Sequence, residues 1–289
     1  MLGYVYAFLC FIFFSFYVLA SKHSLKKINE YLLGFFLQSM FIITIPLVII
    51  FGIPSIGPHF VLALIIGSIL NFIATIFYLK AIKNAEVSST IPFITLTPLF
   101  LLITSPFIVG EYAGLYDMIG IVLIVIGTYV LEIKKNKKGF LSPFKELVKN
   151  KSAIYMLIVA FIYSITSNID KIGVQNSSPL FWVFSLNLIM ALLFACVLLK
   201  KSNFNLNYFK KDLKNIKFAI PAGIFKILTC IFQMLALNLI YVSHVIAIKR
   251  SSVILTVLLG AILFKEKNLK QRIFATLIIV AGVLIMILT

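Results

Sequence analysis

Two adjacent cations lie inside a segment that is otherwise apolar enough to cross a membrane. The segment runs from Val242 to Glu266, and Lys249 and Arg250 fall well inside it rather than at its ends. A charge at that depth costs at least a few kcal/mol on insertion scales, so an ionisable residue there is a candidate for function. Arginine offers a bidentate fork and lysine a mobile point charge, and both suit phosphate or carboxylate. We therefore expect this pair to bind an anionic group. The alternative is a structural pair held by interior carbonyls or by Glu266.

A third cation, Lys226, lies at a similar depth in the apolar segment Phe218–Leu239. It could bind the same anion, or its long stem could carry the ammonium to the membrane surface. Neutral polar side chains at span depth could line a cavity or join helices by hydrogen bonds worth about 0.6 kcal/mol each. The candidate substrate-binding residues are Lys249, Arg250, Lys226, Asn71, Gln38, Asn187, Gln233 and Tyr163.

Charged side chains at the predicted ends of spans favour structural roles. Asp170 and Lys171 end one span, and Lys22 ends another, so we expect solvation or local ion pairs there, with a gate at Asp170 and Lys171 as the alternative. Glu111 and Glu266 also stand at helix ends, where capping or pairing near a loop is expected.

His244 and Trp182 are predicted to lie near the membrane surface, because they begin spans and because aromatic residues gather at membrane interfaces. The carboxylates stand at predicted span ends, so none is expected at the depth of Lys226, Lys249 and Arg250. The interior charge is therefore predicted to be cationic, which favours an anionic substrate.

The composition excludes several classes of function. Of 289 residues, 62% are hydrophobic, and the mean hydropathy is +1.10, whereas soluble chains are about 45–50% apolar. We expect a multi-pass protein of the lipid bilayer. A nucleic-acid partner would need a basic face on a soluble domain, and none is predicted. The sequence has no ATP-binding loop and no deep carboxylate pair, and its three histidines are scattered, so neither an enzyme nor a metal or cofactor site is expected.

Ten stretches are long enough to span a bilayer core, which takes about 20 apolar residues per helix. The predicted fold class is therefore an all-α integral membrane protein with ten transmembrane helices. The stretches are Leu2–Ser21, Tyr31–Phe51, Phe60–Leu79, Ser88–Val109, Leu115–Leu131, Ala153–Ile169, Leu180–Leu199, Phe218–Leu239, Val242–Phe264 and Gln271–Leu288.

The two halves of the chain resemble each other when they are aligned at nearly constant offsets. The informative pairs are Ser88 with Ser243, Glu111 with Glu266, Gly127 with Gly282, Lys22 with Lys171 and Gln38 with Asn187. This predicts a first repeat over residues 1–132, a basic linker over 133–152 and a second repeat over 153–289. An odd number of spans per repeat inverts the second relative to the first. Inverted repeats are common in alternating-access transporters, with the site near the midplane.

Loop charge predicts the orientation of the chain. Nearly all of the net charge of +17 lies in loops that follow odd-numbered spans, whereas the loops after even-numbered spans are slightly acidic because of Glu111 and Asp117. Lys and Arg are enriched on the cytoplasmic side. We therefore expect the odd loops to be cytoplasmic and both termini to face outward, in the plasma membrane.

The repeat and its motifs resemble the drug/metabolite transporter superfamily, specifically its EamA-type members. The first repeat carries Pro98 and Glu111 in TPLFLLITSPFIVGE, and the second carries Val253 and Glu266 at the same spacing. The first helix of each repeat ends in a lysine, as in many members. Two features depart from the family. Val253 replaces the proline that would bend the helix, and many members are thought to keep both termini in the cytoplasm.

A narrower stretch is similar to the ninth helix of plastid triose-phosphate and related sugar-phosphate translocators. It contains Val242, Ser243 and His244 followed by Lys249 and Arg250. In those translocators a Lys-Arg pair grips phosphate, so the resemblance implies that role for Lys249 and Arg250.

The combined expectation is a secondary transporter or exchanger of a small polar metabolite, anionic and bound near Lys249 and Arg250, with a counter-anion or a proton as coupling partner. One alternative is an exporter of amino acids or neutral metabolites, in which the pair is structural or binds only a carboxylate. Another is a non-transporting membrane partner or receptor, which would be a closed bundle without a central polar cavity. Substrate identity, direction and oligomeric state stay open.

Overall fold

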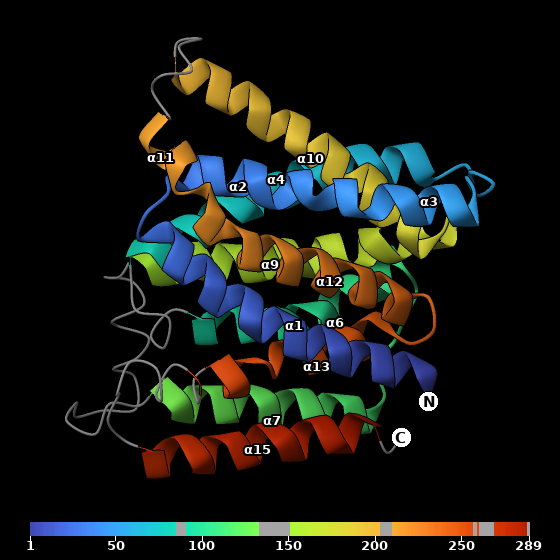
Figure 1. Cartoon of the computed structure of the whole chain (residues 1–289). Coiled ribbons are helices and arrows are strands. Elements are labelled where there is room, and N and C mark those ends of the chain that lie inside the picture. The colour runs from blue at the N-terminus through green and yellow to red at the C-terminus, as the bar shows by residue number, and fades with distance from the viewer. Residues whose placement is uncertain (85–90, 133–150, 203–209, 257–258, 260–268, 288–289) are drawn as a thin grey trace.

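The fold is a bundle of roughly parallel and antiparallel helices (Figure 1). This computed structural model describes residues 1–84, 91–132, 151–202, 210–256, 259 and 269–287. Every regular element in these ranges is a helix. The prediction of an all-α membrane protein is therefore confirmed. The linker over 133–150 and the Glu266 candidate lie outside the described residues.

The first half follows the first five predicted spans. Its helices are α1 (Leu2–Leu25), α2 (Glu30–Ser39), η1 (Met40–Thr44), α3 (Ile45–Phe51), α4 (Phe60–Asn84), η2 (Ile91–Leu96), α6 (Thr97–Ile108) and α7 (Leu115–Glu132). Asn29 starts α2 by accepting a hydrogen bond from the backbone N–H of Tyr31 at 2.9 Å.

The second half follows the remaining five. Its helices are α9 (Lys151–Gln175), α10 (Pro179–Lys201), α11 (Lys210–Lys214), η4 (Ile216–Ala219), α12 (Ile220–Leu237), α13 (Val242–Arg250) and α15 (Leu269–Ile287). Pro179 stands in the first turn of α10, where its missing N–H has no intrahelical partner to lose. Across both halves, six described segments are long and apolar enough to cross a membrane.

The packing of the helices reflects the repeat. Helix α1 packs along α12, and α4 packs along α9. In the aligned halves α1 corresponds to α9 and α12 to α4, so the two pairs are equivalent. Helix α7 packs along its own equivalent, α15. A β-carbon at Gly120 would lie 2.6 Å from the carbonyl oxygen of Gly282, and one at Gly282 would lie 2.6 Å from that of Gly120. Glycine therefore permits this close approach across the approximate twofold axis.

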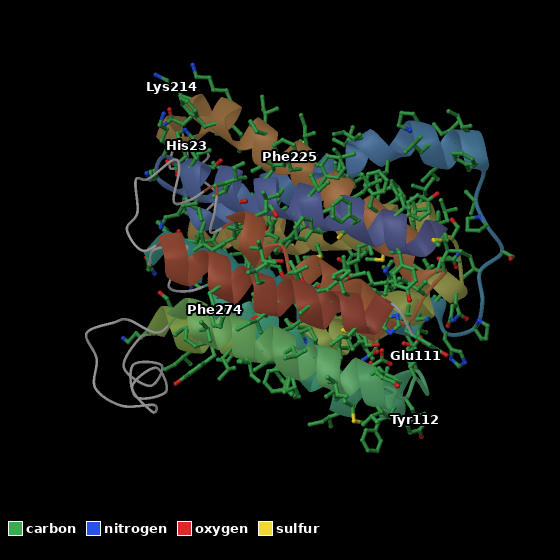
Figure 2. All side chains as sticks on the ribbon, turned by 90° about the horizontal axis from the view of Figure 1, so that it is seen from below. His23, Glu111, Tyr112, Lys214, Phe225 and Phe274 are labelled. Carbon is green, nitrogen blue, oxygen red and sulfur yellow. The ribbon has the colours of Figure 1, made fainter. Side chains whose placement is uncertain are left out.

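The two ends of the bundle differ in charge. Helix α1 begins and α15 ends at the same end (Figure 1). Glu111 and Tyr112 lie at that end, and His23 and Lys214 lie at the opposite one (Figure 2). The described parts of the lysine-rich connections therefore lie opposite the termini, as the predicted topology requires.

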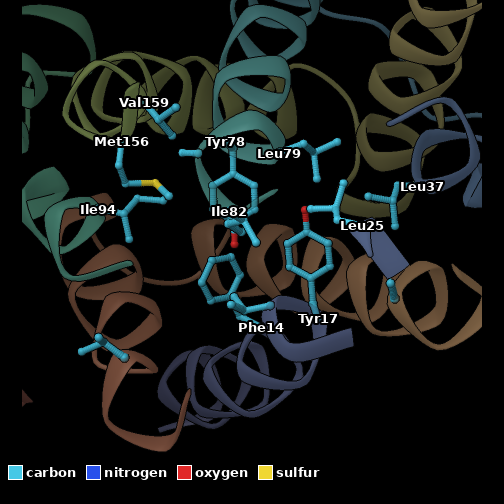
Figure 3. Close-up of a cluster of buried hydrophobic side chains, with 14 of the residues drawn as sticks. Phe14, Tyr17, Leu25, Leu37, Tyr78, Leu79, Ile82, Ile94, Met156 and Val159 are labelled. Carbon is cyan, nitrogen blue, oxygen red and sulfur yellow. The ribbon is translucent and has the colours of Figure 1, made fainter. Parts of the chain in front are cut away.

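Aromatic and aliphatic side chains fill the interior beside this axis (Figure 3). Phe14, Tyr17 and Tyr78 are buried there, and the rings of the two tyrosines stack with centroids 6.0 Å apart. Large apolar side chains such as Ile49 and Phe107 are exposed instead, 74% and 86%. Lipid tails are as apolar as these side chains, so packing rather than exclusion of water holds such helices together.

The ninth predicted span is interrupted, contrary to the expectation that Val253 removes the bend. Helix α13 ends at Arg250, Ser251 and Ser252 form a turn, and helix resumes at Val253. The equivalent break in the first half separates η2 from α6. The hydroxyl of Ser15 in α1 shares its single proton between the carbonyl of Phe11 at 3.0 Å and the carbonyl of Ser252 at 3.2 Å. The Ser252 carbonyl also accepts the backbone N–H of Thr256 at 2.9 Å, so it keeps hydrogen-bond partners inside the protein, which membrane depth requires.

Candidate functional site

A cavity in the middle of the bundle gathers all eight predicted site residues. It is lined from α1, α2, α4, α9, α10, α12 and α13, and its lining includes Lys249, Arg250, Lys226, Asn71, Gln38, Asn187, Gln233 and Tyr163. Polar residues within apolar spans converge because lipid cannot satisfy them. The closed bundle without a polar cavity, expected for a non-transporting partner, is not what the described residues form.

Helical spacing brings the lining side chains onto one face of each helix. From α9 the cavity receives Tyr163, Thr166, Ser167 and Asp170, which are spaced by three or four residues. Such residues lie above one another on a helix surface. A polar stripe along α9 therefore faces a cavity at the centre of the protein.

Lys226 joins the two repeats. Its ammonium donates hydrogen bonds to Gln38 Oε1 and Asn187 Oδ1. Gln38 belongs to the first half of the chain and Asn187 to the second, so the ammonium bridges the two halves. The side chain therefore points into the protein and does not carry its charge to the membrane surface.

Lys249 and Arg250 occupy the last turn of α13, where the carbonyl end of the helix favours cations. Lys249 donates to Gln233 Oε1, and its Nζ lies 5.0 Å from the centre of the Phe14 ring. Arg250 is only 2% exposed, and its guanidinium carbon lies 5.1 Å from the centre of the Tyr163 ring. Its Nε and Nη1 have no hydrogen-bond partner in the described protein. Two buried donors of this guanidinium are therefore unsatisfied.

Asp170 corrects the prediction that no carboxylate lies at the depth of the cations. It is 4% exposed and lines the cavity. Its Oδ1 accepts a hydrogen bond from Nε1 of Trp182 at 3.0 Å. Trp182 itself is fully buried in the protein, so it is not an exposed aromatic anchor. The spacing of Asp170 from Tyr163 and Ser167 was the signal in the sequence that could have identified it.

Two separate regions of the chain, residues 1–133 and 150–288, match the model of the EamA-like transporter family. Together they span most of the sequence. The chain belongs to the EamA-like transporter family. It is accordingly a multi-pass membrane transporter of small metabolites rather than an enzyme.

The fold of this EamA-like transporter has also been seen by crystallography. A solved structure, whose title reads only "Crystal structure of protein", matches it with a TM-score of 0.72 at 20% identity, covering 99% of this chain and 98% of its own. That identity supports the fold alone. Among curated proteins, a sequence search found no match.

At the end that carries the termini, an ion pair joins three segments of the transporter. Lys171 of α9 donates to Glu111 Oε1, and its Nζ lies 3.1 Å from the carbonyl oxygen of Ile240. Glu111 Oε2 accepts a hydrogen bond from the backbone N–H of Val242 at 2.7 Å. The predicted ion pairing of Lys171 and capping by Glu111 are therefore confirmed. Lys22, the repeat equivalent of Lys171, donates to the carbonyl of Ile82 at 2.6 Å.

A second network lies beside this ion pair. His244 is 6% exposed, so its side chain is buried among the helix ends. Its Nδ1 lies 2.9 Å from the hydroxyl of Tyr4, and its Nε2 lies 2.7 Å from Oδ1 of Asp117. The network links the first turns of α1, α7 and α13. The described residues contain no group of three His, Cys, Asp or Glu side chains that could hold a metal ion.

Proposed function

We propose that this EamA-like transporter carries a small organic anion, a phosphate or carboxylate, by alternating access. Lys249 and Arg250 bind the acidic group of the substrate in the central cavity. The observation that supports this most is the pair of buried, unpartnered donors of Arg250, Nε and Nη1. A buried donor left without a partner costs about 1–3 kcal/mol, more when it is charged. An oxyanion bound in two-pronged fashion, through Nη2 together with either Nε or Nη1, would satisfy one of them.

The charge of the cavity supports the same substrate class. Lys226 and Lys249 donate only to neutral amides, and Arg250 has no acidic partner among the described residues. Asp170 is the single carboxylate among the lining side chains. Positive charge therefore exceeds negative charge at membrane depth, where uncompensated charge is expensive. A bound anion lowers this cost. In an exchange mechanism the cationic cavity changes its facing side only with an anion bound, so the empty cavity never has to reorient.

We further propose that the lysine-rich end faces the cytoplasm of a plasma membrane, because cytoplasmic loops are enriched in Lys and Arg. Both termini then face outward. Residues 1–132 and 153–289 act as the two repeats that rock against each other, with the cavity between them.

Counterflow in proteoliposomes tests this proposal. Vesicles are preloaded with phosphate, phosphorylated three-carbon acids, dicarboxylates or amino acids, and uptake of labelled substrate is followed. We expect anion exchange by the wild type and its loss in the double variant Lys249→Gln, Arg250→Gln. The matched control is Lys214→Gln with Lys217→Gln, which removes two exposed charges away from the cavity. Exchange of neutral metabolites alone, unchanged in the first double variant, would make the pair structural and the protein an exporter of another substrate class.

A further inference from the structure

The orientation of Asp170 is fixed by its neighbours on α9 and α10. A β-carbon at Gly173, one turn along α9, would overlap the ring of Trp182. The absence of that carbon lets the indole lie against α9 and reach Asp170 Oδ1 at 3.0 Å. The indole is itself held by Phe60, whose ring meets it edge to face at 5.7 Å. Gly173, Trp182 and Phe60 together therefore fix the position of the Asp170 carboxylate.

The second carboxylate oxygen, Oδ2, is left for another partner. Only Oδ1 of Asp170 takes part in a hydrogen bond within the described protein. No described cation forms an ion pair with Asp170, although Lys226, Lys249 and Arg250 line the same cavity. The two lysines bind amide oxygens instead. An unpaired buried carboxylate is destabilising, so its partner is expected to arrive with the ligand.

Two hydroxyl groups of the same cavity add to the acceptors that Asp170 offers. Ser167, on the same face of α9, donates its proton to the carbonyl of Tyr163 at 2.6 Å. Thr229 of α12 donates its proton to the carbonyl of Phe225 at 2.7 Å. Both hydroxyls line the cavity and can offer it only lone pairs while these bonds hold. By contrast, Arg250 and Asn71 bring unpartnered donor nitrogens to the cavity.

We infer that the substrate carries a protonated amine in addition to its acidic groups, and that Asp170 binds this amine. The inference rests on the proposed binding of the acidic group by Lys249 and Arg250. An ammonium supplies three donors to a carboxylate and to the lone pairs of Ser167 and Thr229. Because three cations outnumber one carboxylate in the lining, a substrate with two acidic groups and one amine matches the cavity better than one with a single acidic group.

Matched pairs of ligands that differ only in the amine test the inference. The pairs are aspartate with succinate, and O-phosphoserine with 3-phosphooxypropanoate. We expect wild type to prefer the amine-bearing member in counterflow by at least about tenfold, the minimum for a hydrogen-bonded charge pair. In Asp170→Asn, which keeps an acceptor for Trp182, this preference should fall to near unity. Asp117→Asn removes a carboxylate outside the cavity and should leave it unchanged.

The ratio within each pair is measured by competition in one preparation, so partial misfolding of a variant cancels. Equal uptake of both members by wild type would overturn the inference, and so would a preference that survives in Asp170→Asn. The proposed function fails separately, if Lys249→Gln with Arg250→Gln transports both members as well as wild type does. Trp182→Phe is the second variant. It frees Oδ1 while keeping an aromatic ring, and it should retain a preference for the amine.

Discussion

The ion pair between Lys171 and Glu111 is expected to hold the terminus-bearing end of the transporter closed. We consider the substitution Glu111→Gln. The side chains of Lys171 and Glu111 are 12% and 11% exposed, so the pair is intermediate between buried and surface ion pairs. Removing one partner of a buried pair costs about 3–5 kcal/mol. A surface pair is worth about 0–1 kcal/mol. We expect a loss of about 2 kcal/mol. If the pair forms only when this end is closed, that loss raises the open population about 30-fold.

Cys230 provides the assay, because it lines the central cavity. Cys10 and Cys196 are replaced by alanine, which leaves one thiol. A membrane-impermeant thiol reagent is added to sealed vesicles on the side that carries the termini, and an N-terminal tag cleaved by external protease reports the orientation. Labelling of Cys230 should accelerate about 30-fold in Glu111→Gln, in proportion to the open population.

Glu30→Gln is the matched control for this experiment. Glu30 pairs with Lys83 at 2.6 Å, and this pair is more exposed, with side chains 15% and 37% exposed. Its loss is expected to cost at most about 1 kcal/mol and to leave the labelling rate from the terminus-bearing side unchanged. If Glu111→Gln labels no faster than wild type, the ion pair does not govern access at this end. Equal acceleration in both variants would point to general loosening of the bundle.

Three further predictions concern the packing of the site. Gly173→Ala should destabilise the protein by about 1–3 kcal/mol, because the added β-carbon overlaps Trp182, and thermal unfolding in detergent should occur at a lower temperature. Gly114→Ala is the control and should not lower it, because its β-carbon would meet Asp117 at an ordinary 3.6 Å. Lys226→Gln should slow counterflow at least about tenfold, because it removes charge-assisted hydrogen bonds to both halves of the chain. The variant should still elute as one species. Unchanged flux would show that transport does not depend on the Lys226 bonds. Ser15→Ala should cost about 1 kcal/mol by removing the hydrogen bond between α1 and the Ser252 carbonyl, which keeps the backbone N–H of Thr256 as its other donor. Its thermal unfolding is compared with that of Ser39→Ala, which removes only a bond within one helix segment.

The sequence was sufficient to locate the spans and the cavity. Charged side chains inside apolar helices favour the protein interior, so Lys249 and Arg250 could be assigned to it from their depth, whereas Lys226 stayed open between the cavity and the membrane surface. Their neutral partners followed from the same argument. The repeat, read from residue pairs, predicted that both halves would contribute to one site.

The remainder depended on contacts between distant segments. The apolar stretch ends at Ile169, yet α9 continues to Gln175. This happens because Trp182 and Glu111 satisfy Asp170 and Lys171 inside the protein. No local sequence pattern predicts Trp182 and Glu111 as these partners. The break after Arg250 was missed because no proline marks it, and the hydrogen bond that Ser15 makes there comes from a distant segment.

Every formally charged side chain that lines the cavity comes from the second repeat, at Asp170, Lys226, Lys249 and Arg250. The first repeat contributes neutral groups such as Gln38 and Asn71. The halves thus share a backbone plan but differ in charge, and under the proposed function the second half binds the ionic groups of the substrate while the first supplies neutral groups. Selectivity can therefore change by mutation of one half alone, and a chimera should inherit the cargo of its second-half donor. Because the halves are unequal, the inward-facing and outward-facing states of the empty transporter differ in free energy. The empty transporter therefore favours one of these two states.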